Sequence, residues 1–313
     1  MNSQNIFKRA IKMKFLTKTA FIFSFLLSLN AHAISILKGA EESFEHRIYV
    51  TSYADYFPFG YHTDANNDWA DNLGSVFRDA ITETKAQDNG PALSYIYFDT
   101  LHEAILDMKT GKTHVFLGAF YATTSFEDFE FVFPAILNNP IHLMMLPDRI
   151  NEVKTVEDLK NLKGVYVKTE MFSTYMLNVF EDLSLTPVEN TDEAYRQLLV
   201  GDIDFILGSF YYQYIKVLET GLKGYIAFSS HPLWKMPMFI ALSKRLENRK
   251  AVSEYFRKII LEETFKETIL ARIKQTIEEK EEEFLGAVPP MYIKERNKTD
   301  LTPADEMLKE NEE

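Results

Sequence analysis

Hydrophobic and polar positions alternate in this chain with periods that predict its elements, and residues 192–209 show this most clearly. Ala194, Leu198 and Leu199 recur at helical spacing, and Gly201 is suited to end that helix. Residues 203–207 (IDFIL) then form a short apolar run with the length of a strand. The stretch therefore predicts a helix followed by a buried strand, which is one α/β unit of an open sheet.

The first half of the chain repeats this alternation. The pattern predicts strands and helices in the order βαβαβ at residues 47–53, 70–84 (with Leu73, Val76, Phe77, Ala80 and Ile81 on one face), 93–98, 101–108 and 114–119. Right-handed crossovers make such strands parallel in one sheet, and ligands bind such sheets beyond the carboxyl ends of the strands. We therefore expect residues 53–61 and 118–125 to border a ligand cleft.

The second half continues the α/β theme after a long apolar stretch at 131–146, which predicts a strand and a crossover into a second domain. The further elements predicted are a short helix capped by Thr155 at 155–162, a strand at 164–168, a helix at 173–181, strands at 224–228 and 237–243, and helix over 248–283. The polar chain after Pro289 and Pro290 is expected to be disordered.

The N-terminus has the three parts of a secretory signal peptide. Basic residues precede an apolar core at 20–29, and Ala31-His32-Ala33 forms an A-x-A cleavage site. The apolar core is far shorter than the roughly 20 residues that span a bilayer, which disfavours a membrane anchor. We expect residues 1–33 to be removed on export; Met13 is an alternative start.

Composition narrows the destination and the partners. The chain has no Cys, so it forms no disulfide and has no Cys for lipid attachment. Loss of residues 1–33 removes five basic and no acidic side chains and takes the formal charge from −12 to −17. So acidic a protein is not expected to bind nucleic acid. Much of the charge lies in the solvated runs 278–283 and 306–313, so it does not by itself indicate a cationic ligand.

Five segments, in order, resemble family 3 of the bacterial extracellular solute-binding proteins, the substrate-binding proteins of amino-acid ABC transporters. They are RIYVTSYADYFPFGY, FEDFEFVFPAI, TVEDLKNLKGVYVKTE, EAYRQLLVGDIDFILGS (similar to "eAlqaLlaGrvDavvgD") and MFIALSKRLENRKAVSEYF. The resemblance extends over roughly residues 47–274. The resemblance implies an α/β, two-lobed type II periplasmic-binding-protein fold, with two open mixed sheets joined by two crossover hinge segments. It implies lobe 1 at 34–138 and 239–294, lobe 2 at 139–238, and a polar tail at 295–313.

The resemblance also implies a function. The protein is expected to be a monomeric periplasmic capture subunit that closes on a small solute by hinge bending and delivers it to an inner-membrane ABC permease. A ligand-sensing module for a membrane signalling partner is an alternative that the sequence leaves open, and so is a dehydratase-like enzyme on the same fold. We expect no enzymatic activity and no cofactor.

Two departures from the family pattern concern the ligand. Ser125 stands where amino-acid binders carry an Arg for the ligand's carboxylate, and Ser209 stands where they carry an Asp for its ammonium. An unpaired carboxylate in a closed site would cost several kcal/mol. Ordinary α-amino acids are therefore not the expected ligand.

Aromatic and hydroxyl side chains dominate the predicted binding site and suit a neutral, aromatic or quaternary-cation solute. For Phe116, Phe129, Phe131 and Phe133 core packing is the preferred interpretation, whereas for Tyr53, Phe57, Phe120 and Tyr212 core and cleft stay open. The candidate ligand-binding residues are Tyr53, Tyr56, Phe57, Gly118, Phe120, Tyr121, Thr123, Ser125, Thr169, Ser173, Ser209 and Tyr212.

Metal and catalytic sites have weaker support. Asp64, Asn66 and Asp68 alternate like calcium ligands, but Trp69 replaces the turn glycine and no Glu closes the loop. The chain lacks a G-x-S-x-G motif and a thiol nucleophile. Glu170, at the head of a predicted helix, is the one carboxylate to test as an acid or base, although a charge stabilising the helix dipole explains it better.

Overall fold

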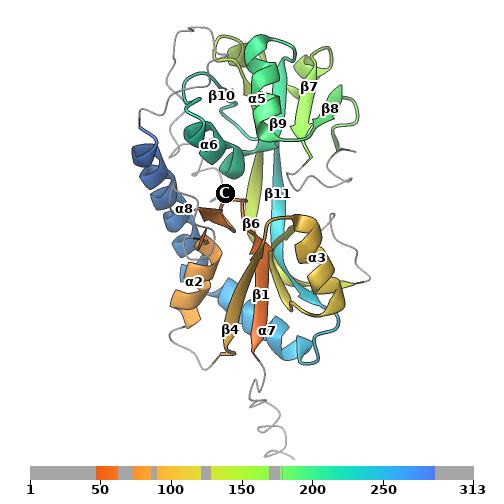
Figure 1. Cartoon of the computed structure of the whole chain (residues 1–313), viewed down its shortest axis with the longest axis vertical. Coiled ribbons are helices and arrows are strands. Elements are labelled where there is room, and N and C mark those ends of the chain that lie inside the picture. The colour runs from red at the N-terminus through yellow and green to blue at the C-terminus, as the bar shows by residue number, and fades with distance from the viewer. Residues whose placement is uncertain are drawn as a thin grey trace, which may run out of the picture. The chain divides into compact units, whose positions relative to one another are not determined.

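The computed structural model describes residues 47–62, 73–85, 90–120, 128–168, 177 and 179–285. Strands from both halves of the chain join in one sheet with the order β4-β1-β5-β11-β6-β9-β7-β8, and β10 pairs with β6 (Figure 1). We call β4, β1 and β5 with helices α2, α3 and α7 the β1 lobe, and β9, β7 and β8 with helices α5 and α6 the β9 lobe. The predicted signal peptide, residues 64–68, Glu170 and the predicted polar tail lie outside the described residues.

The β1 lobe confirms the parallel arrangement predicted for the first half of the chain. Strand β1 (Ile48–Tyr53) pairs in parallel with β4 (Leu93–Phe98) and β5 (Val115–Phe120). Helix α3 (Leu101–Thr110) begins where Thr100 accepts a hydrogen bond from the Glu103 N–H and ends at Gly111, whose φ of 79° is left-handed. The carboxyl ends of β1 and β5 therefore lie at the same edge, as expected.

The helix predicted at 70–84 was wrong at its start. Leu73–Gly74 form strand β3, which pairs with β2 (Tyr61–His62), and helix α2 covers Val76–Lys85. The reason is local, because the Ser75 hydroxyl accepts the Arg78 N–H (3.2 Å) and so caps the helix at residue 75. Leu73 thus belongs to a hairpin rather than to the apolar face of the helix.

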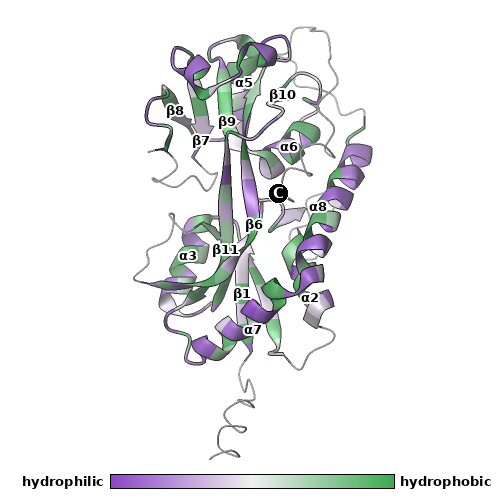
Figure 2. Ribbon diagram, turned by 180° about the vertical axis from the view of Figure 1, so that it is seen from behind, coloured by the Kyte–Doolittle hydropathy of each residue, from purple (hydrophilic) through white to green (hydrophobic). Residues whose placement is uncertain are grey.

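Two long strands cross from one lobe to the other. Strand β6 (Phe129–Met145) and strand β11 (Trp234–Ser243) are antiparallel partners along most of their length. Because both continue through the two lobes, the two predicted sheets share them and hydrogen bonding is unbroken from β4 to β8. Figure 2 shows a hydrophilic stretch on each of β6 and β11 where they pass between the lobes. In the sequence, Asn138 and Asn139 lie within β6, and Lys235 lies near the start of β11.

The β9 lobe contains the predicted α/β unit and two elements that the sequence did not indicate. Helix α5 (Thr191–Val200) and strand β9 (Phe205–Ser209) confirm the unit, and β7 (Gly164–Val167) confirms the strand predicted beside it. Strand β8 (Leu185–Val188) and helix α6 (Phe210–Glu219) are additional. The remaining pieces are η1 (Ile150–Glu152), η2 (Val156–Leu159) and β10 (Ala227–Phe228). The helix predicted at 155–162 is only the single 3-10 turn η2, although its Thr155 capping box is present.

The C-terminal helical region is two helices rather than one. Helices α7 (Arg249–Leu261) and α8 (Glu263–Glu283) are separated by Glu262, whose backbone is extended (φ −67°, ψ 128°). Helix α7 packs on β6 and β11, whereas α8 contacts α2, α7 and α6 (Figure 1). Helix α8 therefore touches both lobes.

Candidate functional site

The candidate site lies where strands from the two lobes end opposite each other. Phe120, the last residue of β5, pairs with Met238 of β11, which pairs with Leu137 of β6. Ser209, the last residue of β9, pairs with Ile141 of β6. The two strand ends are thus four residues apart along β6, about 13 Å at the rise of a strand.

The structure places seven of the twelve predicted ligand-binding residues around this region. Five others, Tyr121, Thr123, Ser125, Thr169 and Ser173, lie outside the described residues. The seven are Tyr53, Tyr56, Phe57, Gly118, Phe120, Ser209 and Tyr212. They come from β1 and the turn after it, from β5, and from the junction of β9 with α6.

Tyrosine rings from the two lobes meet face to face at this site. The Tyr56 ring, in the turn after β1, stacks on the Tyr212 ring of α6 with centroids 5.1 Å apart and planes 12° apart. Tyr53 lies beside Tyr56, with centroids at 6.1 Å, and is partly exposed. Tyr56 is 2% exposed and Tyr212 is 8% exposed, so each covers much of the other. Stacked rings of this kind provide a flat apolar surface with polar hydroxyls at its margin.

Tight packing of the turn after β1 fixes these aromatic residues. The Tyr56 N–H donates to the Gly60 carbonyl (2.9 Å), which closes the turn. Gly118 in β5 has φ +86°, and a Cβ there would lie 2.7 Å from the Phe59 ring. Phe57 (2% exposed) and Phe120 (1% exposed) are buried. Glycine at position 118 is therefore explained by the close approach of Phe59.

A chain of neutral hydrogen bonds connects the lobes behind the rings. The Ser209 hydroxyl donates to Asn139 Oδ1 (2.7 Å), and Asn139 Nδ2 donates to the Tyr56 hydroxyl (3.5 Å). Asn139 is 1% exposed and lies in the crossing strand β6. The position expected to differ from the amino-acid binders, Ser209, is thus hydrogen-bonded to an amide.

Sequence analysis did not single out Asn139. A signal was present, because Asn139 is a polar residue inside the apolar run 131–146, and buried polar groups need partners. Its partners Ser209 and Tyr56 lie 70 and 83 residues away in sequence, and pairing over such separations depends on the register of β6 with β9.

The cation beside the rings is already paired with acidic side chains. Lys216 Nζ of α6 lies 3.0 Å from Asp55 and 2.9 Å from Glu219, and 5.7 Å from the centre of the Tyr212 ring. Burial alone would lower the pKa of Lys216, but Glu219 and Asp55 outweigh burial, and the net shift of the pKa is upward. Lys216 stays charged and neutralised, which reduces its ability to attract a carboxylate ligand.

The neighbouring hydroxyl is held in its neutral form. Burial, followed by the negative charge of Asp55, raises the pKa of Tyr53, although Lys216 partly opposes the shift. Tyr53 can therefore donate a hydrogen bond at neutral pH.

One aromatic residue contradicts its sequence interpretation. Phe116, Phe129 and Phe131 are buried as expected, but Phe133 is 54% exposed, with its ring centroid 5.1 Å from that of Phe239. The register of β6 with β11 jumps between Val132 and Leu137, which leaves Phe133 in an irregular bend of the strand. The core assignment of Phe133 was therefore wrong.

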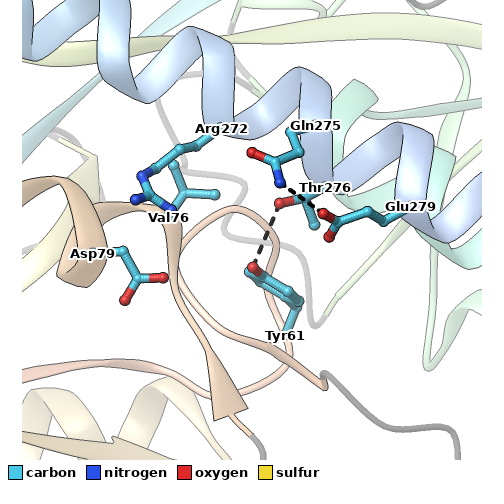
Figure 3. A pocket seen from close by; sticks show the side chains of 7 residues that line it. All are labelled: Tyr61, Val76, Asp79, Arg272, Gln275, Thr276 and Glu279. Atoms are coloured by element: carbon cyan, nitrogen blue, oxygen red, sulfur yellow. Dashed lines mark hydrogen bonds between the residues drawn. The ribbon is translucent and has the colours of Figure 1, made fainter.

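Two hollows lie away from the site formed by Tyr53, Tyr56 and Tyr212. A small polar cavity of about 80 Å³ lies between α2 and α8 (Figure 3), and a larger groove of about 770 Å³ lies between β10, the η1–η2 segment and residues 229–233. Among the described residues, no group of three or more His, Asp or Glu side chains is arranged to hold a metal ion. No described helix has the length and hydrophobicity needed to cross a membrane.

Comparisons with known proteins show similarity in structure alone. No family model and no curated protein matches the sequence. An amino acid ABC transporter substrate-binding protein from Streptococcus pneumoniae, bound to L-arginine, is 16% identical with a TM-score of 0.56, over 74% of this chain and 94% of that one.

Two further solved structures match equally well. The periplasmic VFT2 domain of Bordetella pertussis BvgS is 14% identical with a TM-score of 0.57, over 73% of this chain and 92% of that one. A histidine kinase sensor domain with similarity to periplasmic binding proteins is 15% identical with a TM-score of 0.53, over 80% of this chain and 100% of that one. These neighbours are binding proteins and sensor domains rather than enzymes. The resemblance found in the sequence is thereby confirmed at the level of the fold: the chain has the two-lobed type II periplasmic-binding-protein fold of the amino-acid ABC transporter substrate-binding proteins.

Proposed function

We propose that this protein is a solute-binding protein that holds a small, neutral, flat solute between the β1 and β9 lobes. The observation that supports this most directly is the site where β1, β5 and β9 end and α6 begins. Tyr53, Tyr56 and Tyr212 supply aromatic surface there, and Asn139 and Ser209 supply neutral hydrogen-bonding groups.

The polar groups argue against an α-amino acid. Such a ligand needs a cation for its carboxylate and an anion for its ammonium. Lys216 is held by two carboxylates, and Ser209 donates its proton to Asn139. A ligand carboxylate would have to compete with Asp55 and Glu219 for Lys216. A neutral solute needs no such exchange.

The route of binding follows from the fold. A solute would enter by separating the Tyr56 and Tyr212 rings. The hydrogen bond from Asn139 to Tyr56 is long, at 3.5 Å, and would break more readily than the 2.7 Å bond from Ser209 to Asn139. We propose that the solute then takes the place of one ring in the stack and that hinge movement about β6 and β11 closes the lobes on it.

The cellular role we propose is capture in the periplasm, as a monomer, for an inner-membrane ABC permease. The match to an ABC transporter substrate-binding protein supports this role. A ligand-sensing module is the second candidate, supported by the equally good match to a histidine kinase sensor domain. Uptake of the labelled solute by cells with and without the protein distinguishes the two, because a sensor changes gene expression without itself carrying the solute.

A thermal-shift screen tests the binding proposal. The chain from residue 34 to 313 is heated with neutral aromatic amides and heterocycles, standard amino acids, quaternary amines, sugars and metal ions. Stabilisation by a ligand at 100 times its Kd is about 2.7 kcal/mol, which is easily measured. We expect a concentration-dependent shift with neutral aromatic compounds. A higher melting temperature with standard amino acids would contradict the role assigned to Ser209. No change in melting temperature with any class of compound would contradict solute binding.

A further inference from the structure

Helix α8 is a third connection between the lobes, besides the strands β6 and β11. It contacts α2 and α7 in the β1 lobe and α6 in the β9 lobe. The two ends of α8 make different kinds of contact with the two lobes, and this difference suggests what the helix does.

The first part of α8 is attached to the β1 lobe by both apolar and polar contacts. Ile269 and Ile273 are fully buried, and Arg272 forms an ion pair with Glu83 of α2. Figure 3 shows Tyr61 pointing at Thr276, and their hydroxyl oxygens are 3.5 Å apart. These contacts extend over more than one turn of the helix, so this part of α8 should move together with the β1 lobe.

The last turns of α8 are attached to the β9 lobe through the carboxylate of Glu281. Glu281 Oε1 accepts hydrogen bonds from the Tyr214 hydroxyl and from Lys223 Nζ, the latter at 2.9 Å. Tyr214 is 1% exposed and belongs to α6. Burial, and then its bond to Glu281, raises the pKa of Tyr214, so the hydroxyl remains a donor at neutral pH.

Helix α6 therefore lies between two contacts with the rest of the molecule. Its Tyr212 and Lys216 face the turn after β1, and its Tyr214 faces α8. Thr276 and Glu281 are five residues apart, about 7.5 Å along the helix axis. Over so short a length a helix does not bend appreciably, so movement of α6 away from the β1 lobe must break the bonds to Glu281.

We propose that Glu281 is a latch: α8 moves with the β1 lobe, and the Glu281 carboxylate holds α6 and thereby the lobes in their closed arrangement. This inference rests on the proposed hinge movement. Loss of these bonds to the charged carboxylate should shift the ratio of closed to open molecules by about tenfold, which corresponds to about 1.4 kcal/mol. The latch sets how readily the tyrosine stack opens for a solute.

The absence of Cys from the chain makes a direct test possible. Spin labels are attached at Leu106→Cys in α3 and Val200→Cys in α5, two exposed positions in opposite lobes, and the distance between them is measured by pulsed electron resonance without ligand. Glu281→Gln is compared with Glu278→Gln, the same change three residues earlier on α8. The Glu278 carboxylate pairs with Lys274 of the same helix at 3.9 Å.

We expect Glu281→Gln to increase the population at longer distances by roughly tenfold and Glu278→Gln to leave the distribution unchanged. Lys223→Met is a second variant, at a half-exposed position, and should shift the distribution in the same direction by a smaller factor. Identical distributions in all four proteins, with native circular dichroism, would overturn the latch. Because no solute is present, this result is independent of the ligand screen. Unchanged distances between the lobes refute the latch, whereas an unchanged melting temperature with every compound refutes solute binding.

Discussion

Replacing Ser209 by Ala removes one hydroxyl from the proposed site and tests whether the neutral hydrogen-bond chain has the role assigned to it. The Ser209 hydroxyl donates to Asn139 Oδ1 at 2.7 Å, and both residues are 1% exposed. The substitution leaves a buried carbonyl without this donor, which costs roughly 1–3 kcal/mol. Taking about 2 kcal/mol and a domain of this size, the melting temperature should fall by about 4–8 °C.

A matched control lies near the other end of strand β6, where Ser243 pairs with Phe129. Ser243, the last residue of β11, is fully buried, and its hydroxyl donates to the Met108 carbonyl at 2.7 Å. Ser243→Ala should therefore lower stability by at least as much as Ser209→Ala. It should leave ligand binding unchanged, because Ser243 lies in the β1 lobe away from the tyrosines.

The assay combines urea unfolding with a ligand titration of both variants. We expect similar losses of stability and a loss of affinity, by about tenfold, in Ser209→Ala alone. A stability loss below about 0.5 kcal/mol in Ser209→Ala would refute the buried hydrogen bond. Equal affinities in the two variants would refute the place of Ser209 in the binding site.

Three further predictions concern packing and charge. Gly118→Ala should lower the free energy of unfolding in urea by more than about 2 kcal/mol, because the added Cβ requires a left-handed backbone and collides with the Phe59 ring. Gly201→Ala, at φ +85° but with open space around the Cβ, should cost about 1 kcal/mol. Equal costs would contradict the close approach of Phe59. Lys216→Met should lower stability by roughly 1–3 kcal/mol at low salt, and the loss should shrink at high salt, which screens the ion pairs of Lys216 with Asp55 and Glu219. A loss independent of salt would show that the ion pairs contribute nothing. Burial raises the pKa of five tyrosines above the unfolded value of about 10: Tyr53, Tyr61, Tyr95, Tyr97 and Tyr214. Their contribution to stability is therefore complete below pH 10 and falls as the pH rises above it. Absorbance at 295 nm should show these tyrosines ionising as circular dichroism is lost, whereas ionisation near pH 10 in a folded protein would be contrary evidence.

The elements that the sequence predicted well are those whose signals are local. The strand at 93–98 is rich in aromatic and β-branched residues, and the helix at 191–200 has an N-cap, an apolar stripe and a C-terminal glycine. The parallel order of β4, β1 and β5 followed from the handedness of crossovers, which needs no knowledge of side-chain packing.

Helix α6 was missed because it lacks a polar face. Its residues Phe210–Leu218 are almost all buried, so the segment FYYQYIKVL has no stripe of alternating character. One of its aromatic residues, Tyr212, was interpreted as a candidate for the binding site, and it does lie at the site described. Burial of a helix on all sides depends on the neighbouring elements, here β6, β9 and α8.

Residues of the site could be predicted from the sequence only where their position at the end of a strand was enough to place them there. Tyr53, Phe120 and Ser209 are the last residues of their strands, so topology placed them at the site. Asn139 depends on the register of β6, and the exposure of Phe133 depends on an irregularity in that strand. Neither feature follows from local hydrophobic pattern, because both are set by pairing with distant residues.

Calorimetric titration of the chain from residue 34 to 313 tests the central claim most directly. Neutral planar compounds such as aromatic amides are titrated beside L-arginine and L-glutamate under the same conditions. The account predicts saturable binding of a neutral planar compound, weakened at least about tenfold by Tyr212→Leu, and no binding of either amino acid. Saturable binding of an amino acid, with the neutral compounds silent, would contradict the account of the site.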